Sequence, residues 1–266
     1  MHAFEAHNGG VSLAYEVRGE GDPLLMIHGL GYDRFGWGPL PDLLARDYTV
    51  VVFDNRGVGD SDVPEGPYTV SQMVGDAVAV LDAAGIERAH VFGVSLGGYI
   101  AQEFALTHPE KLDKLVLVST APGGPRSVPM PAAGLEAFGR FPTMEREAGL
   151  RLMVENSLGT YGVEEQPELV EEIYAYRLER GPTLAGWQAQ AYAGATFDAF
   201  DRSPGIEAPT LVLQGGGDNV VDPRNADLLV ELIPNARLEL IPDRGHLMVW
   251  QEANRLAAIV KEFLES

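Results

Sequence analysis

Short runs of apolar residues alternate along this chain with longer segments in which apolar residues recur at helical spacing. Unbroken apolar runs are typical of strands that are buried on both faces of a parallel sheet. The runs lie at residues 24–27, 49–53, 90–94, 115–118, 210–213 and 238–241. Helices are expected between them, at residues 71–84, 96–107, 225–232 and 253–264. The alternation predicts an α/β fold with a mostly parallel central sheet flanked by helices.

Two regions depart from this alternation. Residues 3–6 and 11–17 flank Asn8-Gly9-Gly10, a pattern that predicts an antiparallel hairpin ahead of the parallel strands. Residues 122–204 contain no strand pattern, but they hold helical patterns such as 145–154 and 168–180. A helical insertion between two strands is expected to cover the carboxyl edge of the sheet, where open α/β sheets bind ligands. We therefore expect a core domain of residues 1–121 and 206–266 and a helical cap domain of residues 122–205.

The composition narrows the range of functions. Hydrophobic residues make up 45% of the 266 residues and charged residues 22%, as in ordinary globular proteins. The formal net charge of −20 argues against binding to nucleic acid or to an anionic membrane surface, because both need clustered Lys and Arg. The chain has no Cys, which excludes disulfides, thiolate nucleophiles and Cys-ligated metals. The amino terminus does not resemble a signal peptide and no apolar run is long enough to span a bilayer, so a cytoplasmic location is expected.

Gly93-Val94-Ser95-Leu96-Gly97 matches the pattern G-x-S-x-G and joins a predicted strand to a predicted helix. Glycines on both sides let the backbone turn sharply, which exposes the Ser95 hydroxyl beside a helix amino terminus whose dipole favours a nearby anion. The pattern by itself is common, and a buried structural serine is the alternative. Its place between strand and helix makes Ser95 a candidate nucleophile.

A serine hydroxyl needs a base that takes its proton. His246 follows Gly245 just past the last predicted strand, so its loop reaches the same sheet edge as Ser95, and we expect it to be the base. His90 lies at the start of a strand and therefore at the opposite edge. The other histidines are expected to be solvated, namely His2, His7 and His108, or to fix a tight loop by hydrogen bonding, namely His28.

The base in turn needs a carboxylate that orients it. Asp218 lies in the glycine-rich loop that follows the strand at residues 210–213, at the same sheet edge. A turn-forming or helix-capping role is the alternative for Asp218, but Asp222, directly before Pro223, is better placed to cap the next helix. Ser95, Asp218 and His246 stand in the chain order in which hydrolases with this elbow carry their triad.

The negatively charged oxygen of the transition state needs two N–H donors. We expect one to be the backbone N–H of Leu96, which follows the nucleophile. The other is expected to be the N–H of Leu30 in the loop His28-Gly29-Leu30-Gly31. This chemistry needs no metal and no organic cofactor.

Five stretches, taken in order, resemble the motifs of α/β-hydrolase-fold enzymes with a helical cap, and the resemblance covers essentially the whole chain. They are residues 28–31, 54–61, 93–97, 217–218 and 245–246. Epoxide hydrolases and haloalkane dehalogenases share this frame but have Asp at the position of Ser95. The resemblance is therefore nearest to the carboxylesterase, enol-lactonase and cofactor-free perhydrolase branch.

The resemblance also implies a structural role for Arg56, which ties neighbouring segments together. Trp37 is expected either in the core or at the pocket. The same two alternatives hold for the cap residues Phe138, Phe141, Met144, Tyr161, Tyr174 and Trp187.

These residues predict a serine hydrolase that cleaves small neutral carboxylic esters or lactones through an acyl-enzyme on Ser95. A 3-oxoadipate enol-lactonase-like hydrolase, a perhydrolase and a C–C bond hydrolase remain alternatives, because the same triad supports each. A ligand receptor on a hydrolase fold is the alternative outside enzymes, and a complete triad disfavours it. The expected partner is the small-molecule substrate, and the sequence leaves the oligomeric state, including a homo-oligomer, open.

The choice of a neutral substrate follows from the charge of the cap. Residues 122–205 hold seven Arg and no Lys against twelve Asp and Glu. Most of these Arg lie beside acidic residues, so we expect surface ion pairs and not carboxylate binding. The seven are Arg126, Arg140, Arg146, Arg151, Arg177, Arg180 and Arg202.

Overall fold

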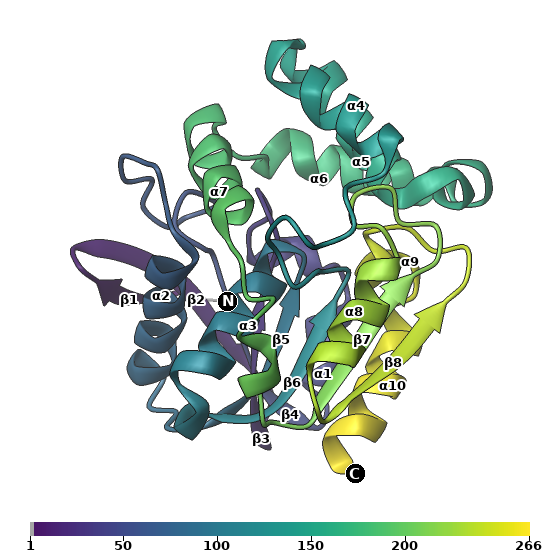
Figure 1. Ribbon diagram of the computed structural model, residues 1–266. Coiled ribbons are helices and arrows are strands. Elements are labelled where there is room, and N and C mark those ends of the chain that lie inside the picture. The colour runs from purple at the N-terminus through teal and green to yellow at the C-terminus, as the bar shows by residue number, and fades with distance from the viewer. Residues whose placement is uncertain (1–2) are drawn as a thin grey trace.

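An eight-stranded sheet runs through the centre of the protein, whose residues 3–266 are described by a computed structural model (Figure 1). The strand order is β1-β2-β4-β3-β5-β6-β7-β8. β1 (Phe4–Asn8) and β2 (Val11–Arg18) form the predicted hairpin, in which Asn8 pairs with Val11. β2 is antiparallel to β4, and the pairs from β4 onward across the sheet are parallel. The predicted mostly parallel α/β sheet is thus confirmed.

The predicted parallel strands are all present and are slightly longer than their apolar runs. They are β3 (Asp22–Ile27), β4 (Tyr48–Phe53), β5 (Ala89–Val94), β6 (Leu112–Val118), β7 (Thr210–Gly215) and β8 (Ala236–Ile241). Every residue of β5 and β7 is buried, as an inner strand covered on both faces requires. β8 lies at the edge of the sheet, and most of its residues are partly or fully exposed.

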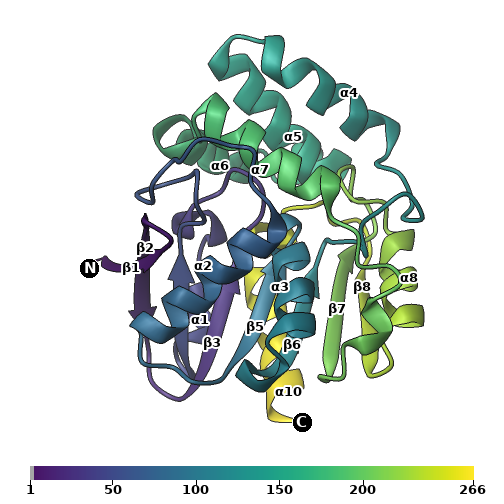
Figure 2. The same ribbon diagram turned by 60° about the vertical axis from the view of Figure 1, so that its left-hand side comes forward.

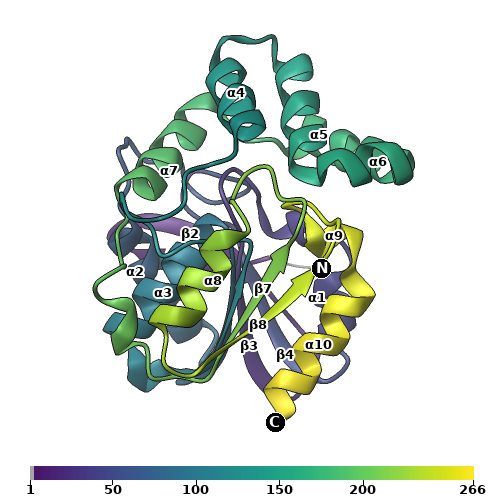
Figure 3. The same cartoon turned by 45° about the vertical axis from the view of Figure 1, so that its right-hand side comes forward.

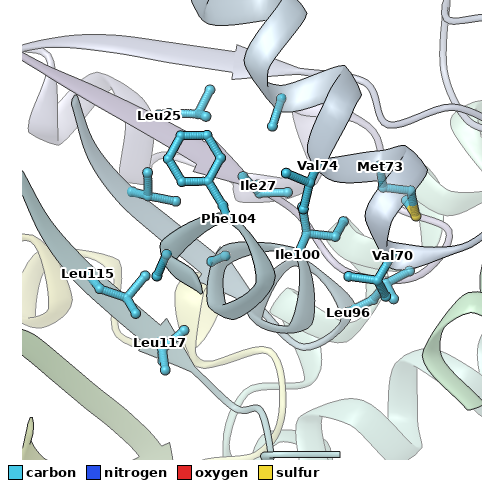
Figure 4. Packing of buried hydrophobic residues seen from close by; sticks show 14 of the residues in the cluster. Leu25, Ile27, Val70, Met73, Val74, Leu96, Ile100, Phe104, Leu115 and Leu117 are labelled. Carbon is cyan, nitrogen blue, oxygen red and sulfur yellow. The ribbon is translucent and has the colours of Figure 1, made fainter. Parts of the chain in front are cut away.

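Helices cover both faces of the sheet (Figures 2 and 3). One face carries α2 (Val70–Ala83), α3 (Leu96–Thr107) and α8 (Arg224–Leu232), and the other carries α1 (Leu40–Leu44), α9 (Met248–Gln251) and α10 (Ala253–Glu265). Each face has its own buried cluster of apolar residues. In the first cluster, Ile100 and Phe104 of α3 pack between α2 and the strands (Figure 4). Short 3-10 helices lie at Arg34–Trp37, Pro109–Lys111, Phe141–Thr143 and Ser203–Gly205.

Between β6 and β7 the chain leaves the sheet and forms four helices above the carboxyl edge of the parallel strands (Figures 1 and 2). They are α4 (Ala132–Arg140), α5 (Arg146–Glu165), α6 (Pro167–Arg180) and α7 (Leu184–Thr196). An isolated bridge between Gly123 and Asp198 joins the two ends of this segment. Residues 122–205 are here called the cap, and its four helices therefore lie over the edge at which Ser95, Asp218 and His246 were expected. None of the helices in residues 3–266 is both long and apolar enough to cross a membrane.

α5 is broken at Gly159, which has φ 69° and ψ 179°. A Cβ at this position would lie 2.8 Å from the carbonyl oxygen of Gly217. Glycine is therefore required there twice, because of the positive φ and because of the close approach to the loop after β7.

Candidate active site

Ser95 lies on the turn between β5 and α3, with φ 55° and ψ −118°. A non-glycine residue at positive φ is strained, and two neighbouring glycines make the turn feasible. A Cβ on Gly97 would lie 1.9 Å from the carbonyl oxygen of Ile27, and one on Gly93 would lie 2.3 Å from that of Gly97. The Ser95 N–H donates to the Val118 carbonyl at 2.9 Å, which ties the turn to β6. The backbone thus holds Ser95 at the carboxyl edge of the sheet.

Asp218 and His246 lie side by side, on the loops that follow β7 and β8. The distance from His246 Nδ1 to Asp218 Oδ2 is 2.9 Å, and both side chains are buried. Asp218 Oδ1 accepts the backbone N–H groups of Val220 and Val221 at 2.8 and 2.9 Å. Asp218 therefore shapes its own turn with one oxygen and contacts the imidazole with the other. An ionised carboxylate only accepts, so this contact requires a proton on Nδ1 of His246, and in the neutral imidazole Nε2 is then an acceptor.

Asp222 serves the start of α8, close to the position expected from the sequence. Its Oδ1 accepts the backbone N–H of Arg224, the first residue of the helix, at 3.0 Å. Its main-chain carbonyl accepts the N–H of Asn225 at 2.9 Å. The helix start is therefore held without the carboxylate of Asp218.

A cavity of about 370 Å³ lies between the sheet edge and the cap, and Ser95, His246, Leu30 and Leu96 all line it. Its walls are mostly apolar, and much of this apolar surface comes from the cap. The residues concerned are Phe138, Phe141 and Trp187, together with Met130, Leu150 and Met153. Of the other cap residues considered above, Met144, Tyr161 and Tyr174 do not belong to its lining.

His28 is the second histidine of the cavity lining, and it lies on the loop after β3. Its Nδ1 accepts the N–H of Gly29 at 2.7 Å, and its Nε2 donates to the carbonyl of Gly36 at 2.8 Å. Burial lowers the pKa of His28 from 6.5 to about 3. His28 is therefore neutral, uses both ring nitrogens within its own loop, and fixes that loop as predicted.

The backbone N–H groups of Leu30 and Leu96, the expected oxyanion donors, lie in the loop after β3 and at the start of α3. Gly29 N–H donates to His28, the Gly29 carbonyl accepts from Tyr32, and both polar groups of Gly31 bond to cap side chains. Among the hydrogen bonds of residues 3–266, none involves the N–H of Leu30 or of Leu96, the first residue of α3. A Cβ on Gly29 would lie 3.0 Å from that of Ser95, so the loop passes directly beside the serine.

Most of the cap arginines form ion pairs, as the sequence predicts. The pairs are Arg126 with Asp201, Arg140 with Glu136, Arg151 with Glu171, Arg180 with Asp33 and Arg202 with Glu103. Arg146 instead donates to the carbonyl of Leu178 at 3.0 Å.

For Arg177 the expected surface ion pair is wrong. Its side chain is buried, lines the cavity, stacks on the ring of Tyr32 and donates to the carbonyl of Gly31. Within residues 3–266 it has no carboxylate partner. The reason is helical geometry, because Val170, Ile173 and Arg177 recur on the inward face of α6 while the acidic neighbours in sequence point elsewhere.

Gln190 of α7 is a residue of the site that the sequence analysis missed. Its side chain is fully buried. Its Oε1 accepts the N–H of Gly31 at 2.8 Å, and its Nε2 donates to the carbonyl of Arg56 at 2.8 Å. These partners are 159 and 134 residues away in the sequence, so no local pattern marks the residue.

Other residues singled out in the sequence lie away from the cavity. Arg56 forms a buried ion pair with Asp76 at 2.6 Å and so joins its loop to α2, the structural role expected. Trp37 is fully buried in the core, beside the ring of Phe92. His90 is buried at the amino end of β5. Of the histidines expected in solvent, His7 is exposed and His108 half-buried, and His2 lies outside the described residues.

Comparison with known proteins identifies the family. Residues 22–253 match the family described as alpha/beta hydrolase fold. The chain belongs to this family. The expected fold class and the resemblance to the hydrolase branch are thereby confirmed, and the protein is a member of a superfamily of hydrolases.

Individual relatives differ in their reactions. The poly(3-hydroxyalkanoate) depolymerase of Ectopseudomonas oleovorans is 32% identical, over 91% of this chain and 84% of its own. A 2-hydroxy-6-oxononadienedioate/2-hydroxy-6-oxononatrienedioate hydrolase of Burkholderia vietnamiensis is 35% identical, over 94% and 90%. The enol-lactonase structure from Burkholderia xenovorans LB400 superposes with a TM-score of 0.87 at 25% identity, over 98% and 100%. The family therefore leaves the substrate open.

Proposed function

We propose that the protein is a serine hydrolase that cleaves small neutral carboxylic esters or lactones. The observation that carries the proposal is that His246, bonded to Asp218, lines the same cavity as a serine on a strained elbow. A cavity of about 370 Å³ with mostly apolar walls suits a small substrate with an apolar acyl or alcohol part. Within the hydrolase family, this constellation is the one that acyl transfer needs.

In the proposed reaction, Ser95 Oγ attacks the carbonyl carbon while His246 Nε2 takes the hydroxyl proton. The electron pair of the carbonyl moves to its oxygen, which the N–H groups of Leu30 and Leu96 stabilise. Asp218 keeps the imidazole in the required tautomer. The tetrahedral intermediate collapses, His246 gives its proton to the leaving alkoxide, and an acyl-enzyme remains on Ser95. In the second half of the reaction, His246 takes a proton from water, whose oxygen attacks the acyl carbon. The new tetrahedral intermediate collapses, the bond to Ser95 Oγ breaks, His246 returns the proton to Oγ, and the acid is released.

The test is turnover of chromogenic short-chain esters and lactones by the intact protein. We expect many cycles per molecule, and stoichiometric labelling by an organophosphate that stops turnover, with the label on Ser95 in a peptide map. A stop after about one cycle would indicate the receptor alternative. A label on another residue would show that the nucleophile is elsewhere. Parallel assays of peracid formation and of a vinylogous diketone substrate test the perhydrolase and C–C bond hydrolase alternatives.

One observation favours a second candidate, an enol-lactonase-like hydrolase whose substrate carries a carboxylate. Arg177 is the single Lys or Arg among the described residues that line the cavity, and Arg binds carboxylates through two parallel N–H groups. Against this candidate, Arg177 already donates to Gly31, and the net charge of −20 slows the encounter with anions. We expect the neutral substrate to be favoured over its carboxylate analogue by at least about tenfold in kcat/KM.

The ratio of kcat/KM for a neutral substrate and its carboxylate analogue separates the two candidates. The ratio is measured in the native protein, in Arg177→Met and in the control variant Arg151→Met. Arg151 pairs with Glu171 and does not line the cavity. If the anionic substrate is the better one and Arg177→Met alone abolishes its advantage, the second candidate replaces the first. An equal change of kcat for both substrates reports on the loop that Arg177 contacts and leaves the first candidate in place.

A further inference from the structure

Side chains of the cap helices α6 and α7 form hydrogen bonds to the loop after β3. The N–H of Gly31 donates to Oε1 of Gln190 at 2.8 Å, and the carbonyl of Gly31 accepts from Arg177. Two residues further on, Asp33 accepts from the Tyr176 hydroxyl at 2.7 Å and from Arg180 at 2.5 Å. The Leu30–Gly31 and Gly31–Tyr32 peptides are therefore each bonded to a side chain of α7 or α6.

The Gln190 side chain bridges two loops of the core domain by hydrogen bonds. It is fully buried, and its amide has one bond at each end, to Gly31 N–H and to the Arg56 carbonyl. Arg56 is itself anchored by its buried ion pair with Asp76. The helix that carries Gln190 is seated closely, since a Cβ on Gly186 would lie 2.1 Å from the carbonyl oxygen of Gly57. Gln190 thus connects the loop that holds Leu30 to the loop of Arg56, which is anchored to α2.

We propose that Gln190 is a positioning residue. By fixing the Leu30–Gly31 peptide through the Gly31 N–H, it holds the adjoining Gly29–Leu30 peptide so that the Leu30 N–H faces the oxyanion. The inference rests on the proposed function, because it concerns the oxyanion of that reaction. Gln190 lines the cavity, but both ends of its amide are occupied by the backbone, so it acts through the loop and not on the substrate. The cap then completes the oxyanion site as well as covering it.

The test replaces Gln190 by Met, which has similar volume and no hydrogen-bonding amide. Loss of a whole oxyanion donor costs about 10²–10³-fold in kcat, and a donor turned away from its ideal direction is expected to cost about 10–100-fold. The affinity for a trifluoromethyl ketone analogue, whose adduct with Ser95 carries an oxyanion, is expected to fall by the same factor. KM and the affinity for the product acid are expected to stay within about threefold of the native values.

Gln102→Met is the matched control. Gln102 is also a fully buried glutamine with hydrogen bonds to backbone carbonyls, of Gly98 at 3.1 Å and Ala121 at 2.9 Å, and it does not line the cavity. We expect it to lower the melting temperature about as much as Gln190→Met does, while kcat and the ketone affinity stay within about threefold. Equal losses of ketone affinity in both variants would overturn the inference, because they would reflect general loosening.

Gln190→Glu is the conservative variant, because it keeps an acceptor oxygen for the Gly31 N–H. It is expected to retain at least about tenfold more kcat than Gln190→Met. If Gln190→Met does not fold, Gln190→Glu carries the test, and a loss of more than about 30-fold in its kcat with native melting overturns the inference.

Two further outcomes separate the inference from the function on which it rests. Native ketone affinity in Gln190→Met, or equal losses of ketone and product-acid affinity, overturns the positioning role alone. If the native protein forms no adduct with the ketone and turns over no ester, the proposed function and this inference both fall.

Discussion

Two loops at the carboxyl edge of the sheet each present a histidine beside a glycine to the same cavity. The two histidines differ in how many of their ring nitrogens are hydrogen-bonded. In the loop after β3, His28 bonds Gly29 N–H with one ring nitrogen and the Gly36 carbonyl with the other. In the loop after β8, His246 uses Nδ1 for Asp218, and Nε2 has no bond among the described residues. A histidine can exchange a proton with a substrate only through a nitrogen that its surroundings leave free. Both histidines are buried and both adjoin a glycine, so these features do not distinguish them. What distinguishes His246 from His28 is that its second ring nitrogen, Nε2, has no hydrogen bond among the described residues.

The largest expected effect removes the group that the free nitrogen would serve. Ser95→Ala is expected to lower kcat by about 10⁴-fold or more, with both histidine loops intact. Labelling by an organophosphate is expected to vanish with it. Steady-state assays and mass spectrometry measure the two.

Ser119→Ala is the matched control, since Ser119 is a buried serine after β6, also at positive φ, and does not line the cavity. We expect it to keep kcat within about threefold. Persistent labelling in Ser95→Ala would contradict the proposed nucleophile.

The next effect breaks the bond that distinguishes His246 from His28. Asp218→Asn is expected to lower kcat by about 10³–10⁴-fold, because an amide does not hold the imidazole in the tautomer with a free Nε2. Asp222→Asn, which alters the start of α8, is expected to cost less than about threefold. Similar losses in both variants would show that Asp218 acts by shaping its loop alone.

The smallest expected effect is that of replacing His28, and it is measured as a change in the pH dependence of the free energy of unfolding. The pKa of His28 is about 3 in the native state and 6.5 in a solvated histidine, so the unfolded chain takes up a proton that the native protein excludes. The unfolding free energy therefore falls as pH drops below about 6.5, by about 1.4 kcal/mol per pH unit from this group. In His28→Gln, the slope between pH 6 and 5 is expected to be shallower by about that amount.

Urea unfolding at each pH measures the slope, and His108→Gln, at a half-buried position, serves as the control variant. Equal slopes in native protein and His28→Gln would mean that His28 is protonated in the native state. Its two hydrogen bonds would then need reassignment.

Strands and core helices were predictable because their signal is local. A run such as residues 90–94 is apolar throughout, and the turn at Ser95 follows from the glycines next to it. The chain order of Ser95, Asp218 and His246 is likewise visible before folding. α1 was missed because five residues are too few to show a helical period.

The cap was harder to predict, since its residues take their roles from distant partners. Arg177 and Glu179 are neighbours in sequence, and the expected ion pair fails because α6 turns Arg177 inward onto Gly31. Gln190 shows no pattern at all, because its role depends on two loops more than 130 residues away. The substrate remains a proposal for the same reason, since the cavity lining is assembled from several such cap residues.

The break in α5 has a consequence for recombining members of this family. Gly159 combines a positive φ with a contact to Gly217, at the crossing of the cap and the Asp218 loop. In a chimera that combines the core of this protein with the cap of another hydrolase, the two sides of this contact come from different parents. In such a library built on the core of this protein, we expect active members where the donor cap carries glycine at this position, and losses where any side chain enters, however well the cavity walls agree.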